Sequence, residues 1–189
     1  MGHGIAQIFA VHGHSVWLVD DQEAALNSAK ERVRANLVNM ANQGVALDED
    51  IEVIVEHIST TMDLAIACGG RTFVFEAVFE NLGLQQKLFA DLDRLCPPDV
   101  ILCSNTSVIS ITEIAEKAEH RERIVGTHFW NPPYLIPLVE VVRAKESSDW
   151  SVSATYDLLA SVGKYPVHVH KDVPGFVGNR LQHALWREA

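Results

Sequence analysis

Four segments of the sequence carry residue types that could support catalysis. In two of them, His128 ends one apolar run and Glu140 lies within the next. Imidazole titrates near neutral pH and can act as a general base, and a neighbouring carboxylate stabilises the imidazolium that forms. These two residues are therefore the candidate base and its partner. The four segments are 104–107, 126–132, 138–141 and 172–180.

The elements that must position these residues follow from the spacing of apolar residues. Short apolar runs alternate with segments of helical periodicity. This alternation predicts an α/β fold with a doubly wound, mostly parallel Rossmann-type sheet covered by helices on both faces. Such sheets bind their ligands at the carboxyl ends of the strands. We expect strands near 15–20, 58–61, 72–78, 100–103, 123–128, 136–143 and 165–169, and helices near 2–11, 22–42, 48–57, 64–66, 82–95, 110–117 and 147–162, with a last helix after Gly175.

Helix 82–95 shows how we expect the helices to pack. Leu84, Leu88, Phe89 and Leu92 recur at helical spacing and form one apolar face. We expect this face to point inward.

Composition and charge exclude several classes of protein. The chain has 189 residues, of which 48% are apolar, and a net charge of −10, which argues against a nucleic-acid partner. No apolar stretch approaches the ~18 residues of a membrane span, and no basic segment precedes an apolar one as in a signal peptide, so we expect no membrane partner and a cytoplasmic location. Cys68, Cys96 and Cys103 form no C-x-x-C pair, which predicts free, buried thiols.

The first 20 residues match the second half of a dinucleotide-binding fingerprint. Gly2 opens a helix, and Asp20 ends the strand that follows. An acid at that position binds ribose hydroxyls and repels a 2′-phosphate, which favours NAD over NADP. The first strand and the first two glycines of the fingerprint are missing from the sequence. We therefore expect a chain truncated by a late start codon or by fragmentation. Because the first strand is central in such sheets, we expect the truncated chain to fold poorly by itself.

Five motifs in order make the sequence similar to the NAD-binding domain of the L-3-hydroxyacyl-CoA dehydrogenase family. The tail of the family's G-x-G-x-M-G-x-G-I-A start matches residues 1–6, and its E-A-x-x-E-N segment matches 76–81. Its S-N-T-S, H-x-x-N-P with V-E, and P-G-F-x-x-N-R motifs match at 104–107, 128–140 and 174–180. The matches span nearly the whole chain.

The resemblance implies roles for individual residues. His128 is the expected base, which removes the proton of the substrate's 3-hydroxyl while carbon 3 gives a hydride to NAD, and Glu140 is the carboxylate that orients it. Ser107 and Asn179 are expected to hydrogen-bond the reacting oxygens of the substrate. The residues expected at the cofactor are Gly2, Asp20, Glu80, Ser107 and Asn131.

The resemblance also implies an organisation and a reaction. Residues 1–179 form the NAD-binding domain, and 180–189 begin an all-helical C-terminal domain that completes the substrate cleft and forms a homodimer. Because that domain lies outside these residues, we expect little or no activity from the 189-residue chain alone. The implied reaction interconverts (S)-3-hydroxyacyl-CoA and 3-oxoacyl-CoA, as in fatty acid metabolism.

Two departures from the family pattern bear on the substrate. Gln85 stands where the family often has a cofactor-contacting lysine, with Lys87 two residues further on. Residues 36–43, where better-known members touch the CoA nucleotide, contain no Lys or Arg. The segment 131–140 also resembles relatives that oxidise free hydroxy acids, namely gulonate and carnitine dehydrogenases. A non-CoA 3-hydroxy acid is therefore the alternative substrate.

Other functions remain as alternatives. A structural or cofactor-sensing relative would tolerate loss of His128 or Glu140, and both are present. A hydrolase triad of Ser107, His128 and Glu140 is disfavoured because no G-x-S-x-G surrounds the serine. The alternating histidines at 12, 14, 168 and 170 lack a cysteine or acid cluster, so we expect no metal site.

Overall fold

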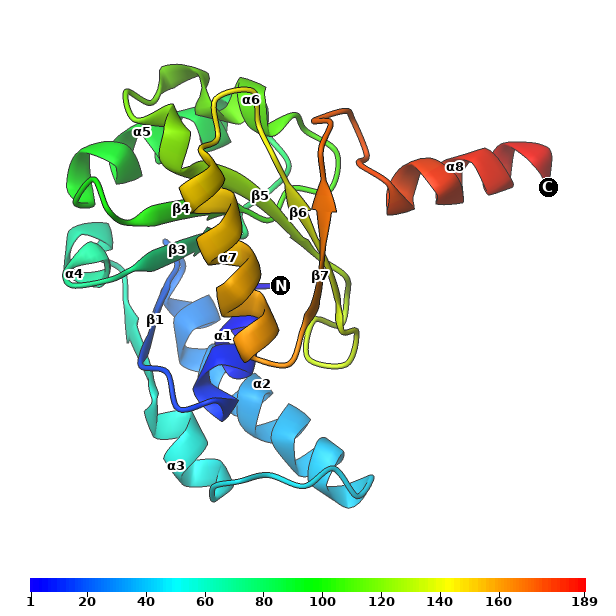
Figure 1. Cartoon of the computed structure of the whole chain (residues 1–189). Coiled ribbons are helices and arrows are strands. Elements are labelled where there is room, and N and C mark those ends of the chain that lie inside the picture. Colours follow the sequence, from blue (N-terminus) through cyan, green and yellow to red (C-terminus); the bar gives the residue numbers. More distant parts are fainter. The chain divides into compact units, whose positions relative to one another are not determined.

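The computed structural model describes all 189 residues, Met1–Ala189, and divides into two compact units. Unit 1 comprises Met1–Gly69 and the loop Asn131–Ile136. Unit 2 comprises Gly70–Trp130 and Pro137–Ala189. Each unit contains a sheet of its own (Figure 1).

Unit 1 is built on a parallel pair of strands, β1 (Val16–Val19) and β2 (Ile58–Thr61). Four helices accompany the pair: α1 (Gly2–Val11), α2 (Glu23–Asn42), α3 (Ile51–Glu56) and α4 (Leu64–Cys68). Helical spacing on α1 and α2 places apolar residues on one side of each helix, and these sides meet β2 and α3 in one core. Its buried members are Ala6, Ala10, Val33, Leu37, Ile54, Val55 and Ile58.

The loop Asn131–Ile136 packs against the first turn of α1. A Cβ atom on Gly4 would lie 2.6 Å from Cγ of Pro133, which is closer than side chains approach in proteins. Only glycine at this position allows the loop to come so near. The loop that carries Asn131 therefore belongs to the same unit as Gly2 and Asp20.

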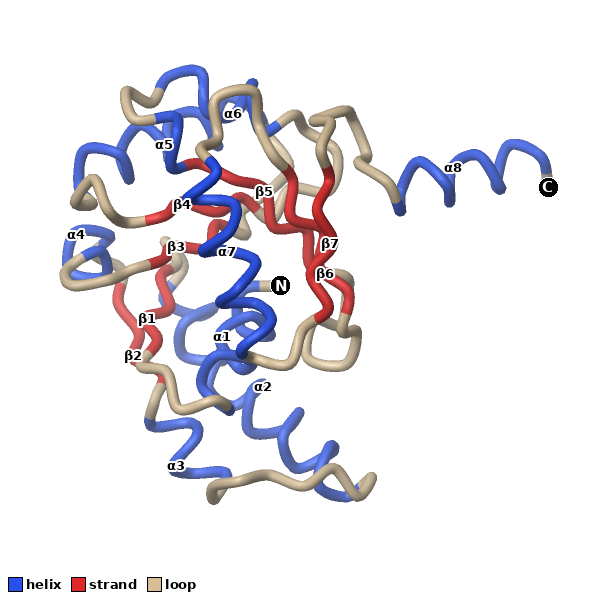
Figure 2. Tube along the Cα trace, viewed as in Figure 1, coloured by secondary structure: helices blue, strands red, loops and turns tan.

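Unit 2 is built on a five-stranded sheet (Figure 2). The order follows the sequence: β3 (Phe73–Glu76), β4 (Ile101–Ser104), β5 (Ile124–Phe129), β6 (Leu138–Val142) and β7 (Tyr165–Val169). Helix α7 (Asp149–Ser161) packs against β5, β6 and β7, while α5 (Leu82–Leu95) and α6 (Ile111–Ile114) pack against β4 and β5. Two 3₁₀ turns, η1 (Ala115–Lys117) and η2 (Arg121–Arg123), precede β5, and α8 (Gly178–Glu188) extends away from this sheet (Figure 1).

The predicted fold class is confirmed as a mixed α/β fold with a mostly parallel sheet. The exception is β6, which runs antiparallel to β5. Strand β1 pairs only with β2, and β3 pairs only with β4. The three cysteines are buried and form no disulfide, as predicted. No helix combines the length and the apolar character needed to cross a bilayer.

The predicted inner face of α5 is partly wrong. Phe89 and Leu92 are buried as expected, but Leu84 is 43% exposed. Gln85, Gln86 and Asp93 are buried instead, because each has a polar partner within unit 2. The apolar spacing alone could not show that polar residues would take part of the inner face.

The strongest of these polar contacts joins Asp93 to Arg123, whose side chain is fully buried. The Arg123 Nη2 atom lies 2.6 Å from Asp93 Oδ1. The guanidinium also donates to the main-chain carbonyls of Asp93 and Cys96, at the end of α5, and of Val100, directly before β4. Burial alone would raise the pKa of Asp93, but its hydrogen bonds to Arg123 and to two main-chain N–H groups hold the pKa below its usual value. The pair fixes the end of α5 beside the start of β5.

We predict that Arg123→Ala lowers the free energy of unfolding by about 3–5 kcal/mol, because it leaves Asp93 buried without its cation. Urea unfolding measures the change. The matched control is Arg94→Ala, since Arg94 pairs with Asp91 on the exposed side of the same helix. Loss of that surface pair should cost less than about 1 kcal/mol. Equal losses in the two variants would contradict this account of the buried pair.

Candidate active site

The centre of the candidate site is a buried pair, His128 and Glu140. The two residues are direct cross-strand partners in the antiparallel register of β5 and β6. Their side chains therefore lie on the same face of the sheet. His128 Nδ1 lies 2.7 Å from Glu140 Oε2, and the two residues are 7% and 2% exposed. The structure thus joins the predicted base to its predicted partner.

The second carboxylate oxygen of Glu140 is held by the turn before α8. The backbone N–H groups of Val177 and Gly178 donate to Oε1 at 2.9 and 3.0 Å. Burial would raise the pKa of Glu140, but the hydrogen bonds from His128, Gly178 and Val177 outweigh it and hold the pKa below its usual value. Glu140 is therefore a carboxylate at neutral pH and can only accept hydrogen bonds. It follows that Nδ1 of His128 carries the proton, which leaves Nε2 as the free basic nitrogen.

Two aromatic rings pack beside His128. The ring centroid of Phe176 lies 5.8 Å from that of His128, and the centroid of Trp130 lies 6.0 Å away. Phe176 is buried and has a φ of 50°, in the left-handed region that a bulky residue rarely adopts. A Cβ on Gly178 would lie 2.0 Å from Cζ2 of Trp130, so the indole occupies the space next to that glycine. These contacts restrict the orientation of the imidazole.

The S-N-T-S loop, residues 104–107, is held from two sides. Glu80 accepts hydrogen bonds from the hydroxyl of Thr106 and from the backbone N–H of Ser107. The amide of Asn179 donates to the carbonyl oxygen of Ser107 at 2.9 Å. The hydroxyl of Ser107 makes no hydrogen bond within the chain and is free to bind a ligand. The structure thus brings three predicted site residues together: Ser107, Glu80 and Asn179.

Asp172 connects the segment that leads into α8 to the start of α6. The sequence analysis did not assign a role to this residue. Its carboxylate accepts from the hydroxyl of Ser110 at 2.7 Å and from the backbone N–H of Ile111 at 3.1 Å. It also accepts from the backbone N–H and the hydroxyl of Thr112, both at 2.7 Å. The sequence did contain a signal for this contact. Asp172 directly precedes the P-G-F motif, and Ser110 and Thr112, whose hydroxyls can donate to a carboxylate, flank the start of a helix. The chain separation of about sixty residues concealed the pairing.

Glu76 and Gln85 form a buried polar cluster that contacts Ser104, the first residue of the S-N-T-S loop. Glu76 accepts from the hydroxyl of Ser104 at 2.7 Å and from Nε2 of Gln85 at 3.4 Å. Burial raises the pKa of Glu76, although these hydrogen bonds and one from Val78 oppose it. Gln85 is fully buried, and Lys87 is exposed on another side of α5. Gln85 is therefore part of the protein interior.

Unit 1 has the features of a phosphate site at the start of α1. This helix begins at Gly2 with no side-chain cap and no acidic residue in its first turn. The first N–H groups of a helix lack intrahelical acceptors, so this end can bind a pyrophosphate. The pKa of His3 is lowered by burial and then by the positive charges of Arg32 and the N-terminus. Arg32, which the sequence analysis did not single out, therefore adds positive charge near this end.

Asp20 follows β1 in the same unit. Its Oδ1 atom accepts from the backbone N–H of Gln22 at 2.9 Å, and Oδ2 accepts nothing within the chain. A carboxylate oxygen without a partner at the end of this strand suits a ribose hydroxyl. A Cβ on Gly2 would lie 3.7 Å from Cδ1 of Leu18, so the helix start lies close to β1. The start of α1 and the Oδ2 atom of Asp20 are thus the groups that the expected phosphate and ribose contacts would use.

Comparison with known proteins shows which family the chain belongs to. Residues 1–173 match the family model described as the NAD-binding domain of 3-hydroxyacyl-CoA dehydrogenase. The chain belongs to this family. It carries the family's NAD-binding domain, and NAD is the cofactor of that domain.

Individual members of the family are similar over nearly the whole chain. Mitochondrial hydroxyacyl-coenzyme A dehydrogenase of Rattus norvegicus is 38% identical over 96% of the chain, which spans 59% of that relative. The 5-formyl-3-hydroxy-2-methylpyridine 4-carboxylate 5-dehydrogenase of Mesorhizobium japonicum is 36% identical over the whole chain, which spans 60% of the relative. The crystal structure of 3-hydroxybutyryl-CoA dehydrogenase from Escherichia coli K12 superposes with a TM-score of 0.93 at 37% identity, covering all of this chain and 39% of the other.

We predict that Glu140 contributes stability that depends on pH. The pKa of Glu140 is lower in the folded chain than in an unfolded one, so its contribution is present above the unfolded pKa of about 4.3 and is lost as the pH falls through the folded value. Urea unfolding between pH 7 and pH 3 should therefore show the stability of the wild type and of Glu140→Gln converging at low pH. Glu188→Gln, at an exposed position, controls for the change in net charge. A constant difference between wild type and Glu140→Gln at every pH would contradict the prediction.

We also predict that Gly178→Ala destabilises unit 2 by about 1–3 kcal/mol, because the new methyl group overlaps the Trp130 indole. Denaturant unfolding followed by circular dichroism measures the loss. The control is Val177→Ala, which keeps both backbone N–H groups that bind Glu140 and removes only an exposed side chain. If Gly178→Ala is as stable as Val177→Ala, the close packing of Trp130 on Gly178 is wrong.

Proposed function

We propose that the protein is an NAD-dependent dehydrogenase that interconverts (S)-3-hydroxyacyl-CoA and 3-oxoacyl-CoA, with His128 as the general base. The observation that carries the proposal is the buried pair of His128 and Glu140, in which Nδ1 lies 2.7 Å from a carboxylate oxygen. Because that carboxylate can only accept, we infer that the proton of the neutral ring is on Nδ1 and that Nε2 is free. Relatives named as hydroxyacyl-CoA dehydrogenases support the reaction class.

In this mechanism Nε2 of His128 removes the proton from the 3-hydroxyl of the substrate. Glu140 stabilises the resulting imidazolium, and the N–H groups of Val177 and Gly178 keep the carboxylate in place while it does so. The chemistry that NAD supplies when bound is acceptance of the hydride from carbon 3. Proton transfer by a positioned imidazole accelerates such reactions by about 10²–10⁴-fold.

Ser107 and Asn179 orient the substrate in the proposed mechanism. Glu80 and Asn179 hold the backbone of Ser107 in place through its N–H and carbonyl groups. The hydroxyl of Ser107 can therefore donate to a substrate oxygen from a defined position. Gly2, Asp20, Glu80 and Asn131 are the proposed cofactor contacts. Positioning of this kind lowers the barrier because the reacting atoms meet in a defined geometry.

A second candidate is a dehydrogenase of a hydroxy acid that carries no CoA. Residues 36–43 of α2 and its end contain no Lys or Arg. Two of them, both half-buried, contact α1: Asn36 donates to Oε1 of Gln7, and Met40 accepts from Nε2 of the same side chain. The similar protein from Mesorhizobium japonicum is named for a pyridine carboxylate. A role without turnover, as a structural or NAD-binding relative, is less favoured because His128 and Glu140 are both present and paired.

The remaining expectations from the family resemblance belong to the same proposal. We propose a homodimer formed through an additional helical domain, a cytoplasmic location and a role in fatty acid metabolism. The similar protein from Rattus norvegicus is named as mitochondrial.

We predict that the full-length protein forms NADH from NAD and (S)-3-hydroxybutyryl-CoA, and that His128→Ala lowers kcat by about 10²–10⁴-fold because the base is lost. Absorbance at the NADH band measures both rates. His168→Ala, which removes an exposed imidazole on β7, is the matched control and should keep the wild-type rate.

The outcomes separate the candidates. An active His128→Ala variant would contradict the role of the base. If the wild type oxidises gulonate or carnitine and not the CoA thioester, with the same loss in His128→Ala, the second candidate replaces the first.

A further inference from the structure

Asn105, the second residue of the S-N-T-S loop, joins this loop to the strand that carries His128. It directly follows β4, and its Oδ1 atom accepts a hydrogen bond from the backbone N–H of Phe129 at 3.0 Å. Phe129 is the residue after His128 and is 2% exposed. The side chain of Asn105 thus holds the main chain directly beside the proposed base.

This contact takes the place of strand pairing at the end of β5. The register of β4 and β5 ends with Ser104 opposite Gly126, so the last three residues of β5 have no partner in β4. On its other edge β5 pairs with β6 as far as Phe129, which lies opposite Val139. A buried N–H group needs an acceptor, and the side chain of Asn105 supplies one where β4 has ended.

The loop from Asn105 to Ser107 is held at each residue. The backbone N–H of Asn105 donates to the carbonyl of Glu76 at 2.9 Å, next to the last pair in the register of β3 and β4. Thr106 is buried, and Glu80 accepts from its hydroxyl and from the backbone N–H of Ser107. The position of Asn105 relative to β5 therefore determines the position of Ser107 as well.

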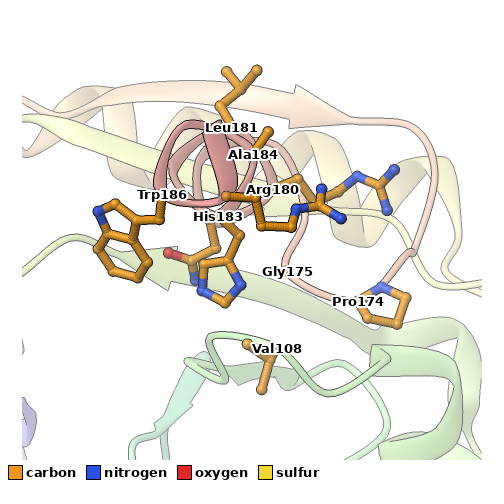
Figure 3. Close-up of a pocket in the computed structure, with 10 residues that line it drawn as sticks. Val108, Pro174, Gly175, Arg180, Leu181, His183, Ala184 and Trp186 are labelled. Carbon is orange, nitrogen blue, oxygen red and sulfur yellow. The ribbon is translucent and has the colours of Figure 1, made fainter. Parts of the chain in front are cut away.

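The loop also faces the turn that binds Glu140. Figure 3 shows Val108, the residue after Ser107, across a cavity from Gly175, which belongs to this turn. A shift of the loop relative to β5 would therefore change where Ser107 lies relative to the pair of His128 and Glu140.

We propose that Asn105 is a positioning residue, which fixes the base His128 relative to the substrate contact Ser107 through its hydrogen bond to Phe129. The proposal rests on the proposed dehydrogenase function. In this role Asn105 acts through the main chain and touches no reacting atom. Proton transfer needs the base and the substrate hydroxyl in a defined geometry, and a displacement of about 1 Å can lower a rate about 10²-fold.

The test compares two substitutions at this position in the full-length protein. Asn105→Ala removes the acceptor and leaves the N–H of Phe129 buried without a partner. Asn105→Asp keeps an oxygen in the place of Oδ1 and removes the Nδ2 amide group. NADH formation from NAD and (S)-3-hydroxybutyryl-CoA gives kcat and KM for the wild type and for each variant.

We expect Asn105→Ala to lower kcat by about 10–10²-fold with little change in KM, because the substrate still binds but the base is displaced. We expect Asn105→Asp to keep most of the wild-type kcat, because the acceptor for Phe129 remains. This recovery separates positioning through Phe129 from a direct contact between Nδ2 and a ligand, which both substitutions would remove.

The matched control is Ser147→Ala. Ser147 is buried, and its hydroxyl donates to the carbonyl of Ile124 at the start of the same strand. Its loss should lower the midpoint of thermal unfolding, as Asn105→Ala does, and leave kcat at the wild-type value.

If Asn105→Ala does not fold, Asn105→Gln takes its place, because one extra methylene group displaces the acceptor while the side chain stays polar. A lower kcat with an unchanged KM is expected again.

A wild-type kcat in folded Asn105→Ala, or equal losses of kcat in Asn105→Ala and Asn105→Asp, would overturn the positioning role. Failure of the proposed function gives a different result. In that case the wild type oxidises neither the CoA thioester nor gulonate or carnitine, and the positioning role is wrong as well.

Discussion

The candidate site depends on the burial of one negative charge. A carboxylate removed from water is costly unless donors surround it, and Glu140 is almost fully buried. Its donors come from two places: His128 on the neighbouring strand, and two consecutive backbone N–H groups, those of Val177 and Gly178. The charge can remain inside unit 2 only while β5, β6 and this turn keep their positions. The same donors fix the imidazole and its tautomer.

The turn before α8 extends that constraint to the rest of the site. Within a few residues it binds Glu140, packs Phe176 on His128, and places Asn179 on the carbonyl of Ser107. The left-handed backbone of Phe176 costs on the order of 1–3 kcal/mol, which the surrounding contacts must offset. Asp172, at the other end of the turn, caps the helix that follows the S-N-T-S loop. One short segment therefore positions the base, its carboxylate and the substrate-facing loop together.

The sequence predicted the elements well because alternation of apolar runs and helical periodicity is a local signal. It also predicted that His128 and Glu140 lie on successive strands, but it could not give the antiparallel register that makes them direct partners. Contacts between distant segments were the least predictable. The caps of Asp172 and the burial of Gln85, Gln86 and Asp93 depend on partners between nine and about sixty residues away, and no periodicity encodes such pairs. The packing of Trp130 on Gly178 could not be predicted either. Trp130 by itself indicates only a packing residue, and Gly178 by itself indicates only a flexible position.

The most direct test of this account is the tautomer of His128 in the full-length protein. Nitrogen-15 NMR of the labelled imidazole, at a pH where the ring is neutral, distinguishes a protonated Nδ1 from a protonated Nε2. The account predicts a protonated Nδ1 and an unprotonated Nε2 in the wild type, because a carboxylate at Glu140 can only accept the hydrogen bond. A neutral imidazole with its proton on Nε2 would contradict the account, since the nitrogen assigned as the base would then have no free electron pair.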